Sequence, residues 1–258
     1  MMQCPPKPAT PLAFALKRHI LQHAHRFWCE IEPAAAASAP IYVFPDQERF
    51  DAEEVEQLAM RNLAGILKAP HPHCIFELPE RDYPGGCLAS YVRAVETGVE
   101  SFLFRHDPTT RIWSDVLVAT EFLPDGYAEA NAHPQYQEPD QYRPTIEVAT
   151  SMVWRALGLL SAATPLVEHQ LSPLRRARFA KAGVRGWTYR VAEIRPATIA
   201  AALAAHRGSH ASPCWHLRRG HWRQLADGRR VFVRECEVGD PSRGGIVKDY
   251  HVQLGEAA

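Results

Sequence analysis

Between about residues 90 and 122 the chain alternates apolar and polar residues, and this pattern most constrains the fold. Three segments carry it, SYVRAVET, VESFLFRH and RIWSDVLVATEFL, separated by Thr-Gly and by Asp-Pro-Thr-Thr. Aromatic and β-branched residues in alternation are typical of strands that bury one face. Short polar turns between such strands predict an antiparallel meander, whose apolar face has to be covered by other elements of the chain.

Other segments predict the helices that cover this sheet. We expect a helix that starts at Thr10-Pro11, one over 52–68 with a capping box at Asp51 and Glu54, a buried one over 146–160, one over 172–181, and a short one opening at Pro196. Residues 41–44, 74–78 and 186–195 predict further strands. Residues 34–40 (AAAASAP) are interpreted as a linker or loop, and residues 125–144, rich in Asp, Glu, Pro, Gln and Tyr, as an exposed loop.

These elements predict an α+β fold, with a mostly antiparallel sheet packed with helices and a small C-terminal all-β module, a hairpin or open barrel. We place an acidic α+β domain at 1–205 and a basic all-β module at 206–258. The 258 residues are enough for one large domain or for two smaller ones.

The net charge of zero hides an asymmetry between the two ends of the chain. Residues 1–170 carry 13 Lys and Arg against 22 Asp and Glu, a net charge of −9, and residues 171–258 carry 16 against 7, a net charge of +9. Either the two halves dock on each other, or the basic half faces an external polyanion.

Several classes of protein lose support. No stretch of about 18 apolar residues predicts a membrane span, and the N-terminus lacks the order of regions found in a signal peptide. We therefore expect a cytoplasmic protein that does not contact a membrane. The six cysteines are spread widely without a Cys-x-x-Cys pair, which favours buried, reduced thiols over a zinc ribbon or a disulfide framework.

The usual cofactor motifs are also missing from the sequence. It contains no GxGxxG, GxxxxGK[ST], GxSxG or HExxH pattern, so we expect no cofactor and no bound metal ion. His19 and His23 lie four residues apart, a spacing that a metal could use, but without a Glu-x-x-His pattern a polar helix face is the favoured interpretation.

The segment 210–252 predicts a compact sheet of three strands. WHLRRGHWRQL and RRVFVREC flank Ala-Asp-Gly, and Asp227-Gly228 is a strong hairpin signal. GDPSRGG predicts a second turn before the strand IVKDYHV. In a continuous first strand Arg219, His221 and Arg223 share one face, about 6–7 Å apart.

Such a trio is suited to chemistry on a phosphate. A histidine moves protons at neutral pH, and arginines stabilise a developing negative charge. For a metal-independent ribonuclease we name His221, His216 and Arg219 as catalytic candidates, with His216, His251 or Asp249 as the second base. The same residues could instead only contact phosphates, or form a solvated face paired with Glu235 and Glu237.

The candidate nucleic-acid-binding residues are the cations of this module and one tryptophan that could stack on a base: Arg218, Arg219, Arg223, Arg229, Arg234, Lys248 and Trp222. Core packing is the alternative role for the tryptophan. The nearby histidines and Cys214 have spacings that fit no standard zinc site.

One resemblance covers roughly residues 172–252. Its motif comprises His216, RRGH at 218–221, Arg223, Gly228, VFVR at 231–234, VGD at 238–240, a glycine at 244 or 245, and KDY at 248–250. RRARFAKAG and WTYRVAEI precede it. The pattern resembles a group of bacteriophage and prophage proteins for which no activity is established. The resemblance implies an origin in a mobile element, and hence the cytoplasm of a host bacterial cell, and implies no activity.

Three functions stay open at this point. The first is a phage- or prophage-encoded nucleic-acid-binding protein, with or without ribonuclease activity. The second is a protein-interaction or anti-defence protein that blocks a host or phage protein without catalysis, for which the acidic half could imitate nucleic acid. The third is an accessory protein of the phage particle. The sequence does not fix the oligomeric state.

Overall fold

In the computed structural model the chain forms two compact units, Met1–Leu203 and Ala204–Ala258. The structure describes residues 10–63, 68–80, 84–96, 98–123, 128–135 and 139–205 of the first unit and its junction with the second. In the second unit it describes the strands at 214–218, 221–224, 230–233, 236–238 and 240–245. Residues 61–63, 139–142 and these last strands are described by their backbone.

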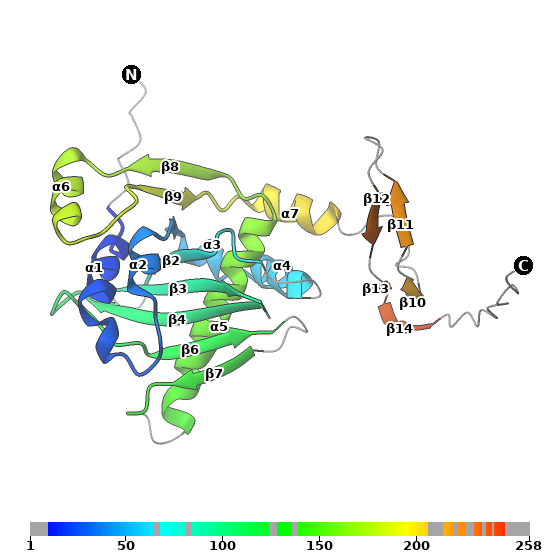
Figure 1. Cartoon of the computed structure of the whole chain (residues 1–258), viewed down its shortest axis with the longest axis horizontal. Helices are drawn as coiled ribbons and strands as arrows, with labels where there is room; N and C mark the ends of the chain where they lie inside the picture. Colours follow the sequence, from blue (N-terminus) through cyan, green and yellow to red (C-terminus); the bar gives the residue numbers. More distant parts are fainter. Residues whose placement is uncertain are drawn as a thin grey trace, which may run out of the picture. The chain divides into compact units, whose positions relative to one another are not determined.

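A nine-stranded sheet forms the centre of the first unit (Figure 1). Its strands are β1 (Ile41–Val43), β2 (His73–Pro79), β3 (Cys87–Val95), β4 (Gly98–Asp107), β5 (Ile112–Trp113), β6 (Val118–Phe122), β7 (Ala128–Ala132), β8 (Leu166–Gln170) and β9 (Thr188–Ala192). The order is β7-β6-β4-β3-β2-β1-β9-β8, and β5 pairs with β4. All neighbours are antiparallel except β1, which runs parallel to β2 and β9. The predicted α+β class and the antiparallel meander are confirmed.

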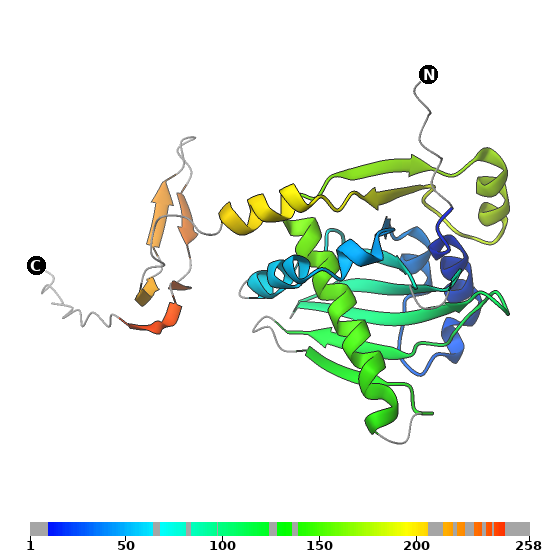
Figure 2. The same ribbon diagram turned by 180° about the vertical axis from the view of Figure 1, so that it is seen from behind.

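Helices cover both faces of the sheet. They are α1 (Ala13–His23), the 3-10 turn η1 (Ala24–Arg26), α2 (Pro33–Ser38), α3 (Gln47–Phe50), α4 (Glu53–Leu63), α5 (Pro139–Ser161), α6 (Pro173–Lys181) and α7 (Pro196–Ala205). Figure 1 shows α1 and α2 in front of the sheet, and Figure 2 shows α5 crossing the strands on the opposite face.

Strand alternation divides the core into two clusters. On β2, Cys74, Phe76 and Leu78 join the cluster that α4 and α5 cover, while Ile75 joins the cluster under α1 and α2. Successive side chains of a strand point to opposite faces, so a strand covered on both sides is mostly apolar. Such a strand supplies buried residues to both clusters at once.

Helix α1 is fixed at its first turn by a residue from the sheet. The helix begins later than Thr10, at an N-cap Leu12 that has no side-chain cap. Instead, the Glu77 carboxylate of β2 accepts hydrogen bonds from the Leu12 and Ala13 backbone N–H groups at 3.2 and 2.6 Å. The predicted start at Thr10-Pro11, with Thr10 as the cap, is therefore wrong: a buried carboxylate satisfies the free N–H groups of this helix end.

Three further sequence predictions are corrected. Residues 34–40 contain helix α2, which Pro33 opens at its first position, instead of a linker. Residues 125–144 contain strand β7 and the start of α5, which passes through Pro144. The predicted capping box at Asp51 does not form, because the Asp51 carboxylate accepts a hydrogen bond from the Arg155 guanidinium. The carboxylate that caps a helix here is that of Asp46, which accepts a hydrogen bond from the Arg49 N–H at the start of α3.

Helices α4 and α5 pack closely against each other. A Cβ atom added at Gly158 of α5 would lie 3.0 Å from the Ala59 Cα of α4, so the small residue permits this approach. Beside it, the Arg155 guanidinium binds Asp51 and Glu56 at 2.7 and 3.1 Å. A close apolar contact and a charged clamp thus hold the two helices together.

The second unit consists of short strands in two sheets. In one sheet β10 (Cys214–Arg218) lies between β13 (Cys236–Val238) and β14 (Asp240–Gly245), and in the other β11 (His221–Gln224) pairs with β12 (Arg230–Val233). The antiparallel pairing of β11 with β12 agrees with the predicted hairpin. The sequence predicts one strand where the structure has β10 and β11, and a turn where it has β14, which pairs in parallel with β10. The strand predicted over IVKDYHV lies outside the described residues.

Among the helices of the described residues, none combines the length and the apolar character that a membrane span requires.

Candidate functional site

The site residues predicted from the sequence belong to the second unit. His216 stands opposite Val238 and Arg218 opposite Cys236 in the β10–β13 pair. His221, Trp222 and Arg223 stand opposite Val233, Phe232 and Val231 in the β11–β12 pair. The remaining candidates lie outside the described residues: Arg219, Arg229, Arg234, Lys248, Asp249 and His251. The shared face of Arg219, His221 and Arg223 assumes one continuous strand, but β10 and β11 are separate strands in two sheets, and Arg219 lies outside the described residues.

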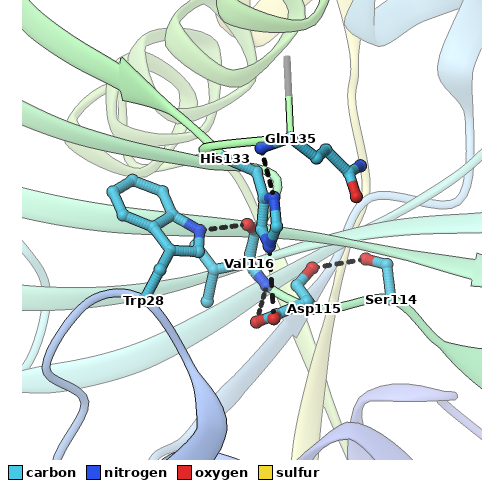
Figure 3. Close-up of polar contacts among 6 residues, drawn as sticks. All are labelled: Trp28, Ser114, Asp115, Val116, His133 and Gln135. Carbon is cyan, nitrogen blue, oxygen red and sulfur yellow. Dashed lines mark hydrogen bonds and ion pairs between the residues drawn. The ribbon is translucent and has the colours of Figure 1, made fainter. Parts of the chain in front are cut away.

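In the first unit a serine, an aspartate and a histidine meet between the end of β7 and the segment before β6 (Figure 3). His133 Nε2 lies 3.4 Å from Asp115 Oδ2, and His133 Nδ1 accepts a hydrogen bond of 3.1 Å from the Gln135 N–H. Because Nδ1 accepts a hydrogen bond, the ring proton is on Nε2, which donates a hydrogen bond to Asp115 Oδ2. Both ring nitrogens are therefore occupied.

The serine hydroxyl of this cluster both donates and accepts a hydrogen bond within the protein. The Ser114 hydroxyl donates to the Asp115 carbonyl oxygen at 2.7 Å and accepts the Arg105 N–H at 3.0 Å. Trp28 Nε1 closes the cluster by donating to the Val116 carbonyl oxygen at 2.6 Å. A hydrolytic triad needs a histidine nitrogen free to accept the proton of the nucleophile. This cluster instead fastens three segments of the fold.

The histidines and the cysteine beside this cluster do not form a reactive centre. Burial and the neighbouring His23 lower the pKa of His19, whose ring lies against that of His23 with centroids 4.7 Å apart. Burial and Asp115 raise the pKa of Cys29 to about 12, so the thiol stays protonated. Cys74 and Cys87 are buried free thiols, as the sequence predicts. The described residues contain no group of three His, Cys, Asp or Glu side chains that could hold a metal ion.

A pocket of about 670 Å³ opens between strand β4 and helix α5. Leu88, Leu103 and Leu117 are among its apolar lining residues. Among its polar lining residues, Arg105 binds both oxygens of Glu80, at 2.6 and 3.0 Å. Asp107 accepts hydrogen bonds from its own turn, which lower the pKa of its carboxyl group. The charged groups of the pocket are thus bound within the protein, and none of them specifies a ligand.

A different arrangement occurs in residues 166–192, which comprise β8, α6 and β9 and which we call the basic arm. Helix α6 follows Ser172 and begins at Pro173, whose fixed φ suits the first helical position. Its Phe179 ring packs on Phe14 of α1 with centroids 5.6 Å apart. After the helix, the Arg185 N–H donates to the Ala37 carbonyl oxygen at 3.0 Å. The helix is thus held beside α1 at an edge of the unit (Figure 2).

Helix α6 and the segment that follows it expose only positive charge, whereas the exposed carboxylate of the arm, Glu168 of β8, pairs with Arg190. Four cations of the arm are exposed and form no ion pair within the described part of the chain: Arg175, Arg178, Lys181 and Arg185, which we call the arm cations. Arg176 is bound by the Leu171 carbonyl oxygen and the Gln170 side chain. Between residues 171 and 195 the single acidic residue is Glu193, which pairs with Arg195. The arm cations therefore have no carboxylate to neutralise them among the described residues.

The sequence predicts this helix correctly but assigns it no function. Its signal is the run RRARFAK after Ser172-Pro173, in which the basic residues recur without an acidic partner. The interpretation of the sequence places the basic surface in the C-terminal module, although the basic half begins at residue 171.

Comparisons of the chain with protein-family models, with curated proteins and with solved structures found no match.

Proposed function

We propose that the protein binds nucleic acid, and that the arm cations form part of the interface. The observation that carries this proposal is the set of four exposed cations without a carboxylate partner in the described residues, presented on a helix and its flank that are packed against the core. Guanidinium and ammonium groups bind phosphates and release the counterions of the nucleic acid. Residues 171–258 together carry a net charge of +9, which favours a polyanionic partner.

The rest of the first unit, outside residues 166–192, which we call the body, differs from the arm in how its arginines are bound. Among them, Arg105 is bound by the carboxylate of Glu80, and Arg155 by those of Asp51 and Glu56. The exposed arginines among the described residues of the body, such as Arg26 and Arg143, are not gathered on one helix. Docking of the acidic half onto the basic half is the competing explanation of the charge asymmetry. The exposure of the arm cations argues against that explanation for the arm.

The test is a titration of fluorescently labelled duplex DNA, single-stranded DNA and RNA with the full chain, at salt concentrations from about 50 to about 200 mM. We expect the double variant Arg178→Ala/Lys181→Ala to weaken binding at least about tenfold. The slope of log K against log salt should become shallower by about 1.8, because each lost phosphate contact contributes about 0.9.

The control is Arg26→Ala/Arg143→Ala, which removes the same charge from exposed positions outside the arm. If this control weakens binding as much as the arm variant does, only the net charge matters and the arm is not the interface. Absence of binding to all three probes at the lowest salt concentration overturns the proposal and favours the protein-interaction alternative.

The catalytic form of the proposal is tested with the same samples. Cleavage of the labelled RNA that is lost in His221→Ala, with binding retained, would support His221 as the acid or base. Intact RNA after prolonged incubation in EDTA would restrict the proposal to binding.

A further inference from the structure

Leu174, on the first turn of α6, is the most exposed large apolar side chain of the described residues. Its exposed fraction is 86%, against 61% for the next, Ile112. It follows the exposed Pro173 and precedes the arm cation Arg175. A single exposed leucine is common on a protein surface. This one lies at the tip of the proposed interface, where a bound nucleic acid would meet it.

The periodicity of the helix places Leu174 on the same stripe as two arm cations. Leu174, Arg178 and Lys181 stand at positions i, i+4 and i+7, which face one side of a helix. The side of the helix that carries Phe179 packs on α1. The stripe consequently points to solvent, with the leucine at the start of the helix and the cations about 6 and 10 Å further along its axis.

The aromatic residues of the arm are turned away from this stripe. Phe179 and Trp187 are half-buried against the core cluster under α1, and Tyr189 is 5% exposed and stacks on His169. Proteins that bind single strands without sequence preference rely on exposed aromatic rings on which bases stack. The described arm offers no such ring, and an aliphatic side chain cannot replace it.

From this surface we infer that the ligand of the arm is double-stranded DNA, with Leu174 inserted into its minor groove as an apolar wedge. This inference rests on the proposed function. Minor-groove proteins use leucine in this way, partly unstacking one base step and bending the duplex. The groove is about 6 Å wide and too narrow for a whole helix. A residue on the first turn can enter it while Arg178 and Lys181 reach the phosphates along its edge.

The experiment uses the full chain and a duplex of about 30 base pairs with a fluorescence donor and acceptor at its ends. We expect the protein to raise energy transfer by bending the duplex, and Leu174→Ala to abolish this rise. The same variant should weaken duplex binding about tenfold and leave the salt slope unchanged, since no phosphate contact is lost. Leu174→Met, which keeps an apolar side chain of similar size, should retain both bending and affinity.

Each other outcome identifies what has failed. If Arg178→Ala/Lys181→Ala weakens binding and Leu174→Ala changes neither affinity nor energy transfer, the wedge is wrong while the proposed function holds. If Leu174→Ala weakens binding to single strands or to duplex RNA as much as to duplex DNA, the assignment to the DNA minor groove is wrong. Binding of the wild-type protein to anionic vesicles but to none of the nucleic acids overturns both proposals. A lower unfolding temperature of Leu174→Ala would show that the leucine serves the fold instead.

Discussion

Arg155, in the part of the first unit outside the basic arm, and the four arm cations differ in what surrounds them. In the body, the Arg155 side chain is 17% exposed and lies between Asp51 and Glu56. In the arm, the four arm cations are exposed and have no ion-pair partner among the described residues. A cation enclosed by carboxylates contributes to stability by staying where it is. An exposed cation without a partner contributes little to folding and stays accessible to an external anion.

The largest expected effect comes from reversing all four arm cations to glutamate. We expect duplex affinity at moderate salt to fall at least about a thousandfold, about 4 kcal/mol, because every contact with a phosphate becomes a repulsion. The free energy of unfolding should change by less than about 0.5 kcal/mol for each exposed position. Fluorescence anisotropy and urea denaturation measure the two quantities on the same samples. A large loss of stability with unchanged affinity would erase the distinction between arm and body.

Lys17 joins helix α1 to the arm, and the next expected effect is the dependence of stability on pH that it causes together with Glu77. This α1 side chain is buried, and its Nζ donates to the Arg185 carbonyl oxygen of the arm at 3.2 Å. Burial lowers the pKa of Lys17 from 10.5 to about 7. Burial likewise raises the pKa of Glu77, the cap of α1, from 4.5 to about 7. Both groups therefore change charge in the folded protein near neutral pH.

The two shifts predict a minimum of stability near pH 7. The Glu77 contribution is complete below pH 4.5 and is lost as the pH rises through about 7, because the folded state holds the proton more tightly. The Lys17 contribution is complete above pH 10.5 and is lost as the pH falls through about 7. The Glu77 contribution amounts to roughly 3 kcal/mol and the Lys17 contribution to roughly 5 kcal/mol, since one pKa unit corresponds to about 1.4 kcal/mol.

Urea denaturation at about pH 5, 7 and 9 measures these limbs, and two variants separate them. Lys17→Met should remove the rise on the alkaline side of neutrality, and Glu77→Gln the rise on the acidic side. Lys17→Met should also stabilise the protein at neutral pH, because it replaces a buried charge by an apolar side chain of similar length. A stability that is flat across this range would contradict the burial of both groups.

A smaller loss is expected for Arg155→Ala, which breaks the clamp between α4 and α5. The variant removes two ion pairs whose arginine is mostly buried and whose carboxylates are 39% and 60% exposed, and we expect about 1 kcal/mol of destabilisation in urea. Arg178→Ala, the matched variant in the arm, should cost less than about 0.5 kcal/mol. Equal losses in the two variants would mean that the arm helix is held by its arginine and not by Phe179.

The elements that the sequence predicts are those whose pattern is local. The alternation of residues 90–122 predicts strands β3, β4 and β6, and the apolar residues of 146–160 predict the buried part of α5. The cap of α1 cannot be predicted in this way, because Glu77 lies 65 residues from Leu12 and reaches it only after the sheet has formed. Strand β7 (AEANA) has small and polar residues that resemble a loop, and its pairing with β6 decides its structure.

For the candidate site, too, the sequence shows the residues but not their surroundings. The cations of α6 are visible in the sequence, but nothing there separates them from the arginines that the body neutralises. Arg155 and Arg178 both occur in helices, and only the fold places carboxylates beside the first and solvent beside the second. The serine, aspartate and histidine of Figure 3 make the converse point, since their types suggest a catalytic triad and their hydrogen bonds exclude one.

The smallest effect is expected for the one ion pair that joins the two strands of the arm among the described residues. Arg190 of β9 lies 3.3 Å from Glu168 of β8, with 30% and 51% of the two side chains exposed. A pair this accessible to water is worth at most about 1 kcal/mol, so a double-mutant cycle with Arg190→Ala and Glu168→Ala should give a coupling energy below that value. Glu168→Ala should also strengthen duplex binding about two- to threefold, because it removes the carboxylate that competes with phosphate for Arg190. Unchanged affinity in Glu168→Ala would confine the interface to α6 and exclude the strands that support it.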